Sequence, residues 1–511
     1  MSKANFICTT PAFSDLESLV ASIPDGATIA LSGSGGGIQE PDVLCAAIEA
    51  RFKATGHPHG LTLVHALGIG DGEKTGINRF AWPGMVKRVI GGHWTWSPRM
   101  QALARDNEIE AYTLPAGVIQ HLYREIGAGR PGLITHVGMG TFADPEHGGG
   151  KCNARAQEDL VERITLGGKT YLWYKPFKID VALIRGSVAD SKMNISARHE
   201  AADMEIVACA MAAKNNGGLV LAQVREITAQ AITPARAVSV PGILVSAVQA
   251  APEQPQLHGY TAYDPRVSGE LAPPAVQAAN AATKHTETAG VLGIRDIIAQ
   301  RAAKELNPKH SLNFGFGIPD GVPEIAQQQG IQLNWLSVEQ GLINANLLKG
   351  RLFGAGLYPQ AIMRSTDQFD FYSGGGVDTA FLGLGEVDQE GNVNVSWLGK
   401  DIIGPGGFVD IAQGAKKVVF CGSLEAKGLV VNQTPDGTIQ IEQYGQVAKF
   451  IPKVRHITFS GPEAIKRGQE VLYVTERAVF QLTPEGVKLI EVFKGVDAQR
   501  DVVARMGFKP V

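Results

Sequence analysis

The sequence predicts an α/β protein of two tandem, related, open α/β/α domains with mostly parallel sheets. Three observations favour this class. Short runs of β-branched residues alternate with helical stretches along the 511 residues. Glycine-rich loops follow several of these runs, and 61 residues are glycine. Segments of the first half recur in the same order in the second half.

In the first half, short apolar runs are separated by loops and helical stretches. The expected strands are 28–31, 61–65, 86–90, 181–185 and 219–224. The expected helices are 40–54, 99–106 and 199–213. Strand, glycine loop, helix and strand in succession are typical of a parallel sheet with helices on both faces.

The second half repeats this pattern after a segment, 250–288, that is rich in Pro, Ala, Gln and Thr. The expected strands are 312–316, 334–338, 379–384, 417–421 and 470–474, and the expected helices are 294–306 and 410–415. We therefore expect a first domain over 1–265, a linker over 266–289 and a second domain over 290–511.

Three pairs of segments carry the internal repeat, although any two parallel strands share some likeness. They are Thr28–Pro41 with Ser311–Pro323, Val181–Ser196 with Thr379–Ser396, and Ala213–Gln223 with Gln413–Gly422. Their common order favours two related domains over chance.

Composition excludes several classes of protein. The net charge is -3 and no basic block occurs, which argues against nucleic-acid binding. No apolar run reaches the length of a membrane span, and the N-terminus lacks the apolar core of a secretory signal. The five cysteines are scattered without a C-x-x-C pair, which predicts buried, reduced thiols, no metal site and a cytoplasmic location.

Common catalytic signatures are absent. The Gly33–Gly37 loop has Ile38 where a dinucleotide fingerprint needs a small residue, and Gly168–Thr170 lacks the preceding glycine of a P-loop because Arg163 stands there. No G-x-S-x-G of a serine hydrolase occurs.

The most informative segment is Leu336–Asn344, in which Glu339 follows a strand-like run and precedes Gly341. Ligands of open α/β sheets bind at the carboxyl ends of strands. Taken alone, such a glutamate is more often a solvated loop residue. Glycine- or asparagine-rich segments beside other strand-like runs favour a reactive role for Glu339: GSGGG at 33–37, NFGFGIP at 313–319, FDFYSGGGVD at 369–378, GNVNVS at 391–396 and GPGGF at 404–408.

Together with KRVIGGHW, YKPFKIDVALIRG, GPGGFVDIAQGAKKVVFCGSL and LYVTERAVFQLTPEG, these segments resemble the family I coenzyme A transferases. The similarity runs from about Leu16 to Lys509 and is greatest to the single-chain group in which α and β subunits are fused. The resemblance implies the CoA-transferase fold with its active site between the domains. It also implies that Glu339 is the nucleophile, forming a γ-glutamyl-CoA thioester in a ping-pong reaction.

The resemblance further assigns roles to glycines. Gly406 and Gly407, supported by Gly404, would contact CoA and stabilise oxyanions through backbone N–H groups. Gly374, Gly375 and Gly376 would line the CoA channel or form a plain turn. Asn392 would be a supporting donor, or else a turn residue before a strand.

The acyl pocket is expected to include Gly35, Gly36, Ala116, Gly341 and Leu342. Two places differ from the family pattern. Pro115-Ala116-Gly117 stands where Pro-Gln-Gly is common, so Ala116 replaces the glutamine. Bulkier residues, Leu342–Ala345, follow the E-x-G motif. Both changes lie where the acyl group is expected.

The prediction is therefore a CoA-transferase that moves CoA from a short-chain acyl-CoA to a free carboxylic acid. An acyl-CoA hydrolase and a CoA-binding paralogue with altered catalysis are the alternatives. CoA and its esters are substrates, so no cofactor and no metal are expected. The resemblance implies a homo-oligomer, a dimer or tetramer.

Overall fold

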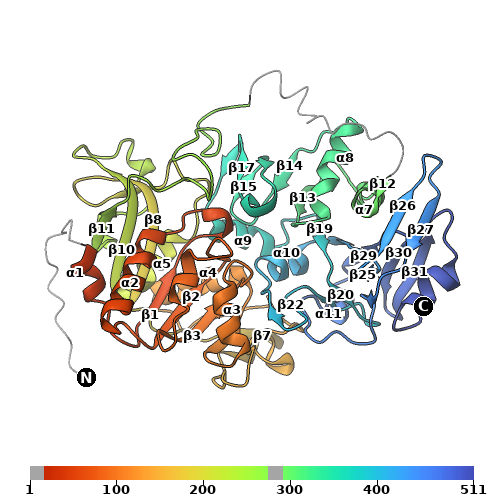
Figure 1. Ribbon diagram of the computed structural model, residues 1–511, viewed down its shortest axis with the longest axis horizontal. Helices are drawn as coiled ribbons and strands as arrows, with labels where there is room; N and C mark the ends of the chain where they lie inside the picture. The colour runs from red at the N-terminus through yellow and green to blue at the C-terminus, as the bar shows by residue number, and fades with distance from the viewer. Residues whose placement is uncertain (1–15, 274–291) are drawn as a thin grey trace.

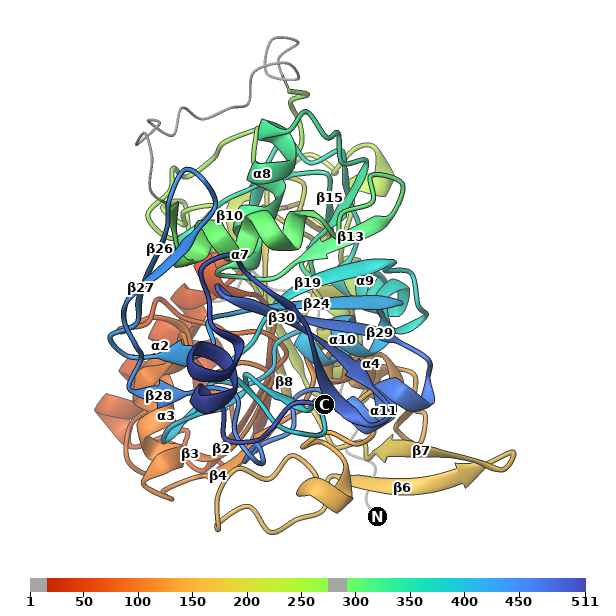
Figure 2. The same ribbon diagram turned by 90° about the vertical axis from the view of Figure 1, so that its right-hand side faces the viewer.

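The structure of the chain is a computed structural model, which describes residues 16–273 and 292–511. Two α/β halves lie side by side (Figure 1), the first coloured red to yellow-green and the second green to blue. The predicted fold class is confirmed, since each half is built on its own large sheet. Figure 2 shows the second sheet from its side, with the β6–β7 hairpin of the first half projecting away from the main body.

The first sheet has the order β11-β10-β8-β1-β2-β3-β4, and every neighbouring pair along this path is parallel. Its strands are β1 (Thr28–Leu31), β2 (Leu61–His65), β3 (Val86–Gly91), β4 (Glu110–Thr113), β8 (Val181–Ala189), β10 (Leu219–Ile227) and β11 (Ala247–Ala250), with β9 (Ile195–Ser196) antiparallel beside β8. Every residue of β8 is buried. Burial on both faces explains why its sequence is largely apolar without alternation, with Arg185 and Ser187 as buried polar exceptions.

The second sheet has the order β18-β15-β14-β13-β19-β24-β29-β30-β31. Its strands are β13 (Ser311–Phe314), β14 (Trp335–Ser337), β15 (Leu342–Ile343), β18 (Ala361–Ile362), β19 (Thr379–Gly383), β24 (Lys417–Cys421), β29 (Glu470–Val474), β30 (Ala478–Thr483) and β31 (Gly486–Val492). The centre is parallel, from β14 through β13, β19 and β24 to β29, whereas the strands at both ends are antiparallel. The sequence did not predict these antiparallel ends.

Both halves also contain smaller sheets of two or three strands. They are formed by β5 (Leu133–Thr135), β6 (Val161–Leu166) and β7 (Lys169–Tyr174), by β12 (Leu292–Gly293), β26 (Val430–Gln433) and β27 (Ile439–Gln443), and by the pairs β16 (Asn346–Leu347) with β17 (Gly356–Leu357), β20 (Glu386–Val387) with β21 (Val393–Asn394), β22 (Trp397–Leu398) with β23 (Asp401–Ile402), and β25 (Glu425–Ala426) with β28 (Val447–Ala448).

The α-helices of the described ranges are α1 (Leu16–Ala21), α2 (Asp42–Thr55), α3 (Pro98–Arg105), α4 (Ala116–Gly127), α5 (Ile206–Asn215), α7 (Ile294–Ala303), α8 (Val322–Gln328), α9 (Ser365–Ser373), α10 (Phe408–Gly414) and α11 (Gly461–Lys466). The helix expected over 199–213 begins only at Ile206. The residues before it form turns that direct Glu200 to Arg185 and Glu205 to the Gly33 N–H. The sequence did not predict α4 and α9.

The two halves share one hydrophobic core. Its largest cluster includes Ala116 and Tyr123 from the first half and Val338, Phe369 and Val409 from the second. Helices α4 and α9 meet there, because Arg124 pairs with Asp370 at 2.6 Å and Figure 1 places both helices between the sheets. The site between the halves is therefore enclosed by continuous packing.

Two further expectations concern the chain between the halves and the cysteines. Of the predicted linker over 266–289, residues 274–289 lie outside the described ranges, while Arg266 already contacts the second half by accepting from the Tyr358 N–H at 2.7 Å. The described cysteines, Cys45, Cys152, Cys209 and Cys421, are buried and unpaired, as predicted. Among the described helices, none has the length and apolarity that a membrane span requires.

Candidate active site

Glu339 lies in a tight turn at the carboxyl end of β14. The Gly341 N–H donates to Val338 O at 2.9 Å, and the chain returns as antiparallel β15, with Ile343 opposite Ser337. Gly341 has a φ of +97°, and a Cβ at this position would lie 2.0 Å from Met363 O. Only glycine fits this turn, so the E-x-G spacing fixes the place of the carboxylate.

The Glu339 carboxylate is held by two donors. The Gly407 N–H donates to its Oε2 at 2.8 Å, and Gln340 Nε2 lies 3.4 Å from its Oε1. Gln340 Nε2 also donates to Ser34 Oγ of the first half at 3.1 Å. Burial raises the pKa of Glu339 to about 7, against the opposing effect of the Gly407 and Gln340 hydrogen bonds. The carboxylate is therefore unusually basic, and near neutral pH its protonated and ionised forms coexist.

The GPGGF segment approaches Glu339 more closely than any side chain would permit. A Cβ on Gly407 would lie 2.1 Å from Glu339 Oε2. Three backbone hydrogen bonds join this segment and the preceding Ile403 to the first half: Trp94 N–H to Ile403 O at 2.7 Å, Gly406 N–H to Gly92 O at 2.8 Å, and Ala116 N–H to Gly406 O at 2.9 Å. The loop is thus part of the interface between the halves.

These hydrogen bonds separate the roles expected for the three glycines. The Gly406 N–H is occupied by Gly92 O, and the Gly404 N–H by Ser396 O at 3.0 Å. Of the three glycines, only Gly407 directs its N–H at the Glu339 carboxylate. The expectation that both Gly406 and Gly407 face an oxyanion is corrected in this respect: Gly404 and Gly406 shape and anchor the loop, with φ values of +78° and +52°.

His93 lies beside the same loop, although the sequence analysis did not select it. A Cβ on Gly406 would be 3.7 Å from His93 Cδ2 and 3.9 Å from both Glu339 oxygens. Burial, reinforced by His65, lowers the pKa of His93 to about 4, so the ring is neutral at pH 7. Its GGHW motif marks a strand end, which is the one signal in the sequence that could have found it.

The Gly33–Gly37 loop closes the other side of the site. Ser34 contacts Gln340, and a Cβ on Gly35 would lie 2.3 Å from Trp96 Nε1. Gly36 has a φ of +77°, and a Cβ at this position would lie 2.9 Å from Arg351 O of the second half. The structure therefore brings Gly35 and Gly36 next to the Glu339 turn.

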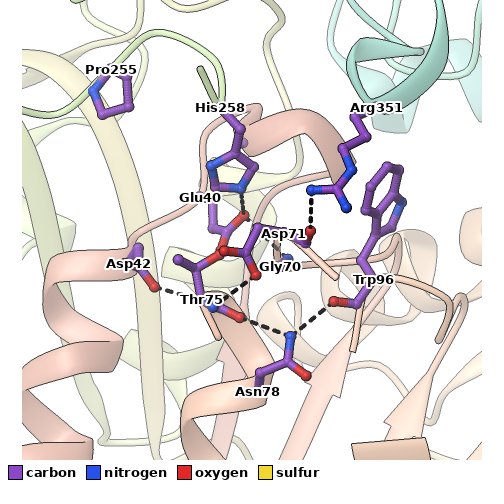
Figure 3. A network of polar contacts seen from close by, with 12 residues as sticks. Glu40, Asp42, Gly70, Asp71, Thr75, Asn78, Trp96, Pro255, His258 and Arg351 are labelled. Atoms are coloured by element: carbon purple, nitrogen blue, oxygen red, sulfur yellow. Dashed lines mark hydrogen bonds and ion pairs between the residues drawn. The ribbon is translucent and has the colours of Figure 1, made fainter. Parts of the chain in front are cut away.

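A polar network supports this loop from behind (Figure 3). His258 Nε2 lies 3.0 Å from Glu40 Oε2, which also accepts from the Gly70 N–H at 3.2 Å. From the second half, Arg351 donates to Asp71 O at 3.2 Å. A cavity of about 410 Å³ borders Glu40 and His258 but is not lined by Glu339. The network fixes the glycine loop rather than forming the reactive centre.

The remaining expected residues are Ala116 and Leu342 of the expected acyl pocket and the three glycines after α9. Ala116 is fully buried and donates its N–H to Gly406 O, and Leu342 is buried at the start of β15. Gly374, Gly375 and Gly376 form the turn after α9, and Gly376 O accepts from Ser311 Oγ at 2.5 Å, at the amino end of β13. The structure does not bring this turn to Glu339, because the two lie at opposite ends of the parallel strands.

Asn392 also serves the fold rather than the site. Its Nδ2 donates to Asp388 at 3.1 Å, and its Oδ1 accepts from the Gly461 N–H at 3.0 Å. Both ends of the amide are thus occupied in the turn before β21. The turn interpretation, one of the two stated for this residue, agrees with this geometry.

The structure thus places a buried glutamate in a glycine-lined interface between two open α/β halves, and comparisons with known proteins show the family to which such a chain belongs. Residues 13–251 match the family described as Coenzyme A transferase. The chain is 39% identical to acetate CoA-transferase YdiF of Escherichia coli (strain K12) over 490 residues, 96% of this chain and 90% of that protein. It is also 39% identical to caffeate CoA-transferase of Acetobacterium woodii over 497 residues, 96% of this chain and 92% of that one.

The fold agrees with a solved relative. The crystal structure of the acyl-CoA transferase YdiF from E. coli O157:H7, a thioester complex with CoA, has a TM-score of 0.90 at 38% identity, covering 98% of this chain and 94% of that chain. The chain belongs to the coenzyme A transferase family, and the protein is a CoA-transferase.

Proposed function

We propose that this CoA-transferase works by a ping-pong mechanism through a γ-glutamyl-CoA thioester on Glu339. One observation carries the proposal: the Glu339 carboxylate is buried, held at 2.8 Å by the Gly407 N–H and placed on a rigid turn between the halves. A preorganised donor at this distance serves the oxyanion that develops during acyl transfer. The high pKa of Glu339, about 7, makes its carboxylate a better nucleophile than an ordinary one.

The first half-reaction has two steps. A Glu339 oxygen attacks the acyl-CoA carbonyl, the C–S bond breaks, and a mixed anhydride and CoA thiolate form. The thiolate then attacks the glutamyl carbonyl, which releases the first carboxylate and leaves the glutamyl thioester. A second carboxylate reverses these steps and leaves as its CoA ester.

The substrate class we propose is a short-chain acyl-CoA with a short-chain carboxylate acceptor. The loop glycines Gly35 and Gly36 are covered by Trp96 and Arg351, which limits the room beside Ser34. A relative named for caffeate marks an aromatic acid as the second candidate. No metal or organic cofactor enters this scheme. We also propose that the protein is cytoplasmic and forms a homo-oligomer. Light scattering would measure the number of subunits.

The test is peptide mass spectrometry after mixing the enzyme with acetyl-, propionyl- and caffeoyl-CoA. We expect a CoA adduct on the peptide that contains Glu339, and its loss when acetate is added. Glu339→Ala should form no adduct and lose at least about 10⁴-fold in kcat. Glu425→Gln, which removes a buried carboxylate outside this site, is the matched control and should still form the adduct.

Two outcomes would contradict the proposal. An adduct on another residue would exclude Glu339 as the nucleophile. Steady release of free CoA without an acceptor acid would instead identify a hydrolase that uses the same thioester.

A further inference from the structure

A second buried carboxyl group, Asp410, lies beside the Glu339 loop and has no part in the chemistry described so far. It stands in the first turn of α10, two residues after the GPGGF segment, and is 1% exposed. The N-cap of this helix is Gly407, the residue whose N–H contacts Glu339. Any movement of α10 is transmitted to that N–H.

Asp410 reaches across the interface to the first half. Its Oδ2 accepts from the Gly117 N–H, in the first turn of α4, at 3.2 Å. A Cβ on Gly117 would lie 2.3 Å from Asp410 Oδ1. Within residues 16–273 and 292–511, Oδ1 has no hydrogen-bond partner although it is buried. The carboxyl is thus packed against a glycine that leaves room for it.

The same arrangement surrounds both carboxyl groups. Each lies against a glycine that donates its N–H, Gly407 for Glu339 and Gly117 for Asp410. The ring of Phe369 contacts both glycines, at 2.9 and 2.8 Å from their missing Cβ positions. The two carboxyl groups are therefore connected through one buried, closely packed layer, in which charges interact more strongly than in water.

Charge links the two groups as well. Burial is the main cause that raises the pKa of Asp410 to about 7; the negative charge of Glu339 acts in the same direction, and His121 and the Gly117 N–H act against it. Coupling of this kind is reciprocal, so a charged Asp410 makes Glu339 harder to ionise. Other titratable groups face the pair from neighbouring elements: His121 on α4, Tyr174 on β7, Tyr372 on α9 and His93 after β3.

We propose that Asp410 is a positioning residue for Glu339: it fastens α10 and the Gly407 N–H to α4, and its negative charge keeps the Glu339 carboxylate basic. This inference rests on the glutamyl thioester proposed above. A more basic carboxylate attacks a thioester faster, so the charge on Asp410 favours the first step. The hydrogen bond to Gly117 keeps the donor in place while Glu339 becomes an acyl derivative.

The experiment measures the rate of thioester formation on Glu339 from acetyl-CoA between pH 5 and 9, by quenching and peptide mass spectrometry. Asp410→Asn keeps the acceptor for the Gly117 N–H but removes the charge. We expect its acid limb to move about one pH unit lower than that of the wild type. Asp410→Ala also loses the contact, and its rate above pH 8 should fall about tenfold below that of Asp410→Asn, with unchanged CoA affinity.

Asp388→Asn is the matched control. Asp388 is equally buried, but the hydrogen bonds it accepts come from Glu390 and Asn392 in its own turn and from Val454. Its acid limb should coincide with that of the wild type. An equal shift in Asp388→Asn would contradict a specific role for Asp410.

The remaining outcomes separate the two proposals. If the wild type forms the adduct and the profile of Asp410→Asn coincides with it, only the role of Asp410 is excluded. If the wild type forms no adduct at Glu339, the glutamyl mechanism fails and this inference with it. Should Asp410→Ala fail to fold, by circular dichroism, the isosteric Asp410→Asn decides alone.

Discussion

After equivalent strands, β2 in the first half and β14 in the second, the chain follows different paths. In the first half, β2 is followed by Ala66, Leu67 and Gly68, and the chain crosses over to the parallel strand β3. In the second half, β14 is followed by Val338 and then Glu339, Gln340 and Gly341, and the chain reverses into antiparallel β15. Strand β2 pairs with β1, with Thr62 opposite Thr28, as β14 pairs with β13, with Trp335 opposite Ser311. Counted from these pairs, Ala66 is the counterpart of Glu339.

The glycine at the end of each segment decides between these paths. Gly341 has a φ of +97°, whereas Gly68 is not among the residues with positive φ. A left-handed residue reverses the chain within a few residues and leaves the preceding side chain at the tip of a short turn. The Glu339 carboxylate therefore lies where one half of a repeated fold has a hairpin in place of a crossover.

The largest effect is expected when the Gly407 N–H, which donates to Glu339 in the second half, is displaced. Gly407→Ala places a methyl group 2.1 Å from Glu339 Oε2 and must displace either the carboxylate or the N–H. We expect kcat to fall about 10²- to 10³-fold, as for the loss of an oxyanion donor. Stopped-flow assays of thioester formation check this, and a variant with more than a tenth of the wild-type rate would contradict it.

The next effect concerns the turn itself. Gly341→Ala forces a left-handed alanine, with its Cβ 2.0 Å from Met363 O, so the turn must open. We expect kcat to fall about 10²-fold, because a displacement of about 1 Å suffices for this. In the matched variant Gly68→Ala the methyl group would lie 2.4 Å from Trp96 Cδ1 and 2.8 Å from His93 Nδ1. Both neighbours are side chains that can shift, and the backbone needs no left-handed residue, so the loss should be clearly smaller. Equal losses would show that the two glycines are equivalent.

A third effect appears in stability instead of rate. The pKa of Glu339 is raised to about 7, so the folded protein holds this proton more tightly than the unfolded chain. The stabilisation is complete below the unfolded pKa near 4.5 and is lost as pH rises through about 7. Glu339→Gln, whose amide oxygen can still accept from Gly407, should raise Tm by a few degrees at pH 8 and leave it unchanged at pH 4. Calorimetry at both pH values tests the sign.

The smallest effect is expected at Glu205, a buried carboxyl group of the first half. Glu205 accepts from the Gly33 N–H at 3.3 Å and from Gln120 at 3.0 Å, and contacts no reactive atom. Glu205→Gln keeps an acceptor for the glycine loop, so kcat/KM should change by no more than about threefold. A loss comparable with that of Gly407→Ala would mean that the first half contributes to the chemistry as directly as the second.

The sequence was sufficient to place Glu339 at the end of a strand because that signal is local: a strand-like run, a carboxylate and a glycine that permits a turn. Its role as the nucleophile stays a prediction. The fold class was predictable for the same reason, since strands and helices alternate with clear periods. The occupied N–H of Gly406 was not predictable, because it depends on Gly92, which lies over 300 residues away in the chain. Asp410 was missed because its position in a short helix resembles an ordinary acidic first turn, and its burial arises only when α4 packs against it.

The three backbone hydrogen bonds that join Trp94, Gly92 and Ala116 to the GPGGF loop have a consequence for how activity depends on concentration. The reactive carboxylate and its donor belong to one half, but the loop keeps its shape only against the other. If the halves were made as separate polypeptides, turnover would require their encounter and would rise with protein concentration until the complex saturated. In the single chain that encounter is intramolecular, so the connection between the halves acts as a fixed effective concentration and makes the active site independent of dilution.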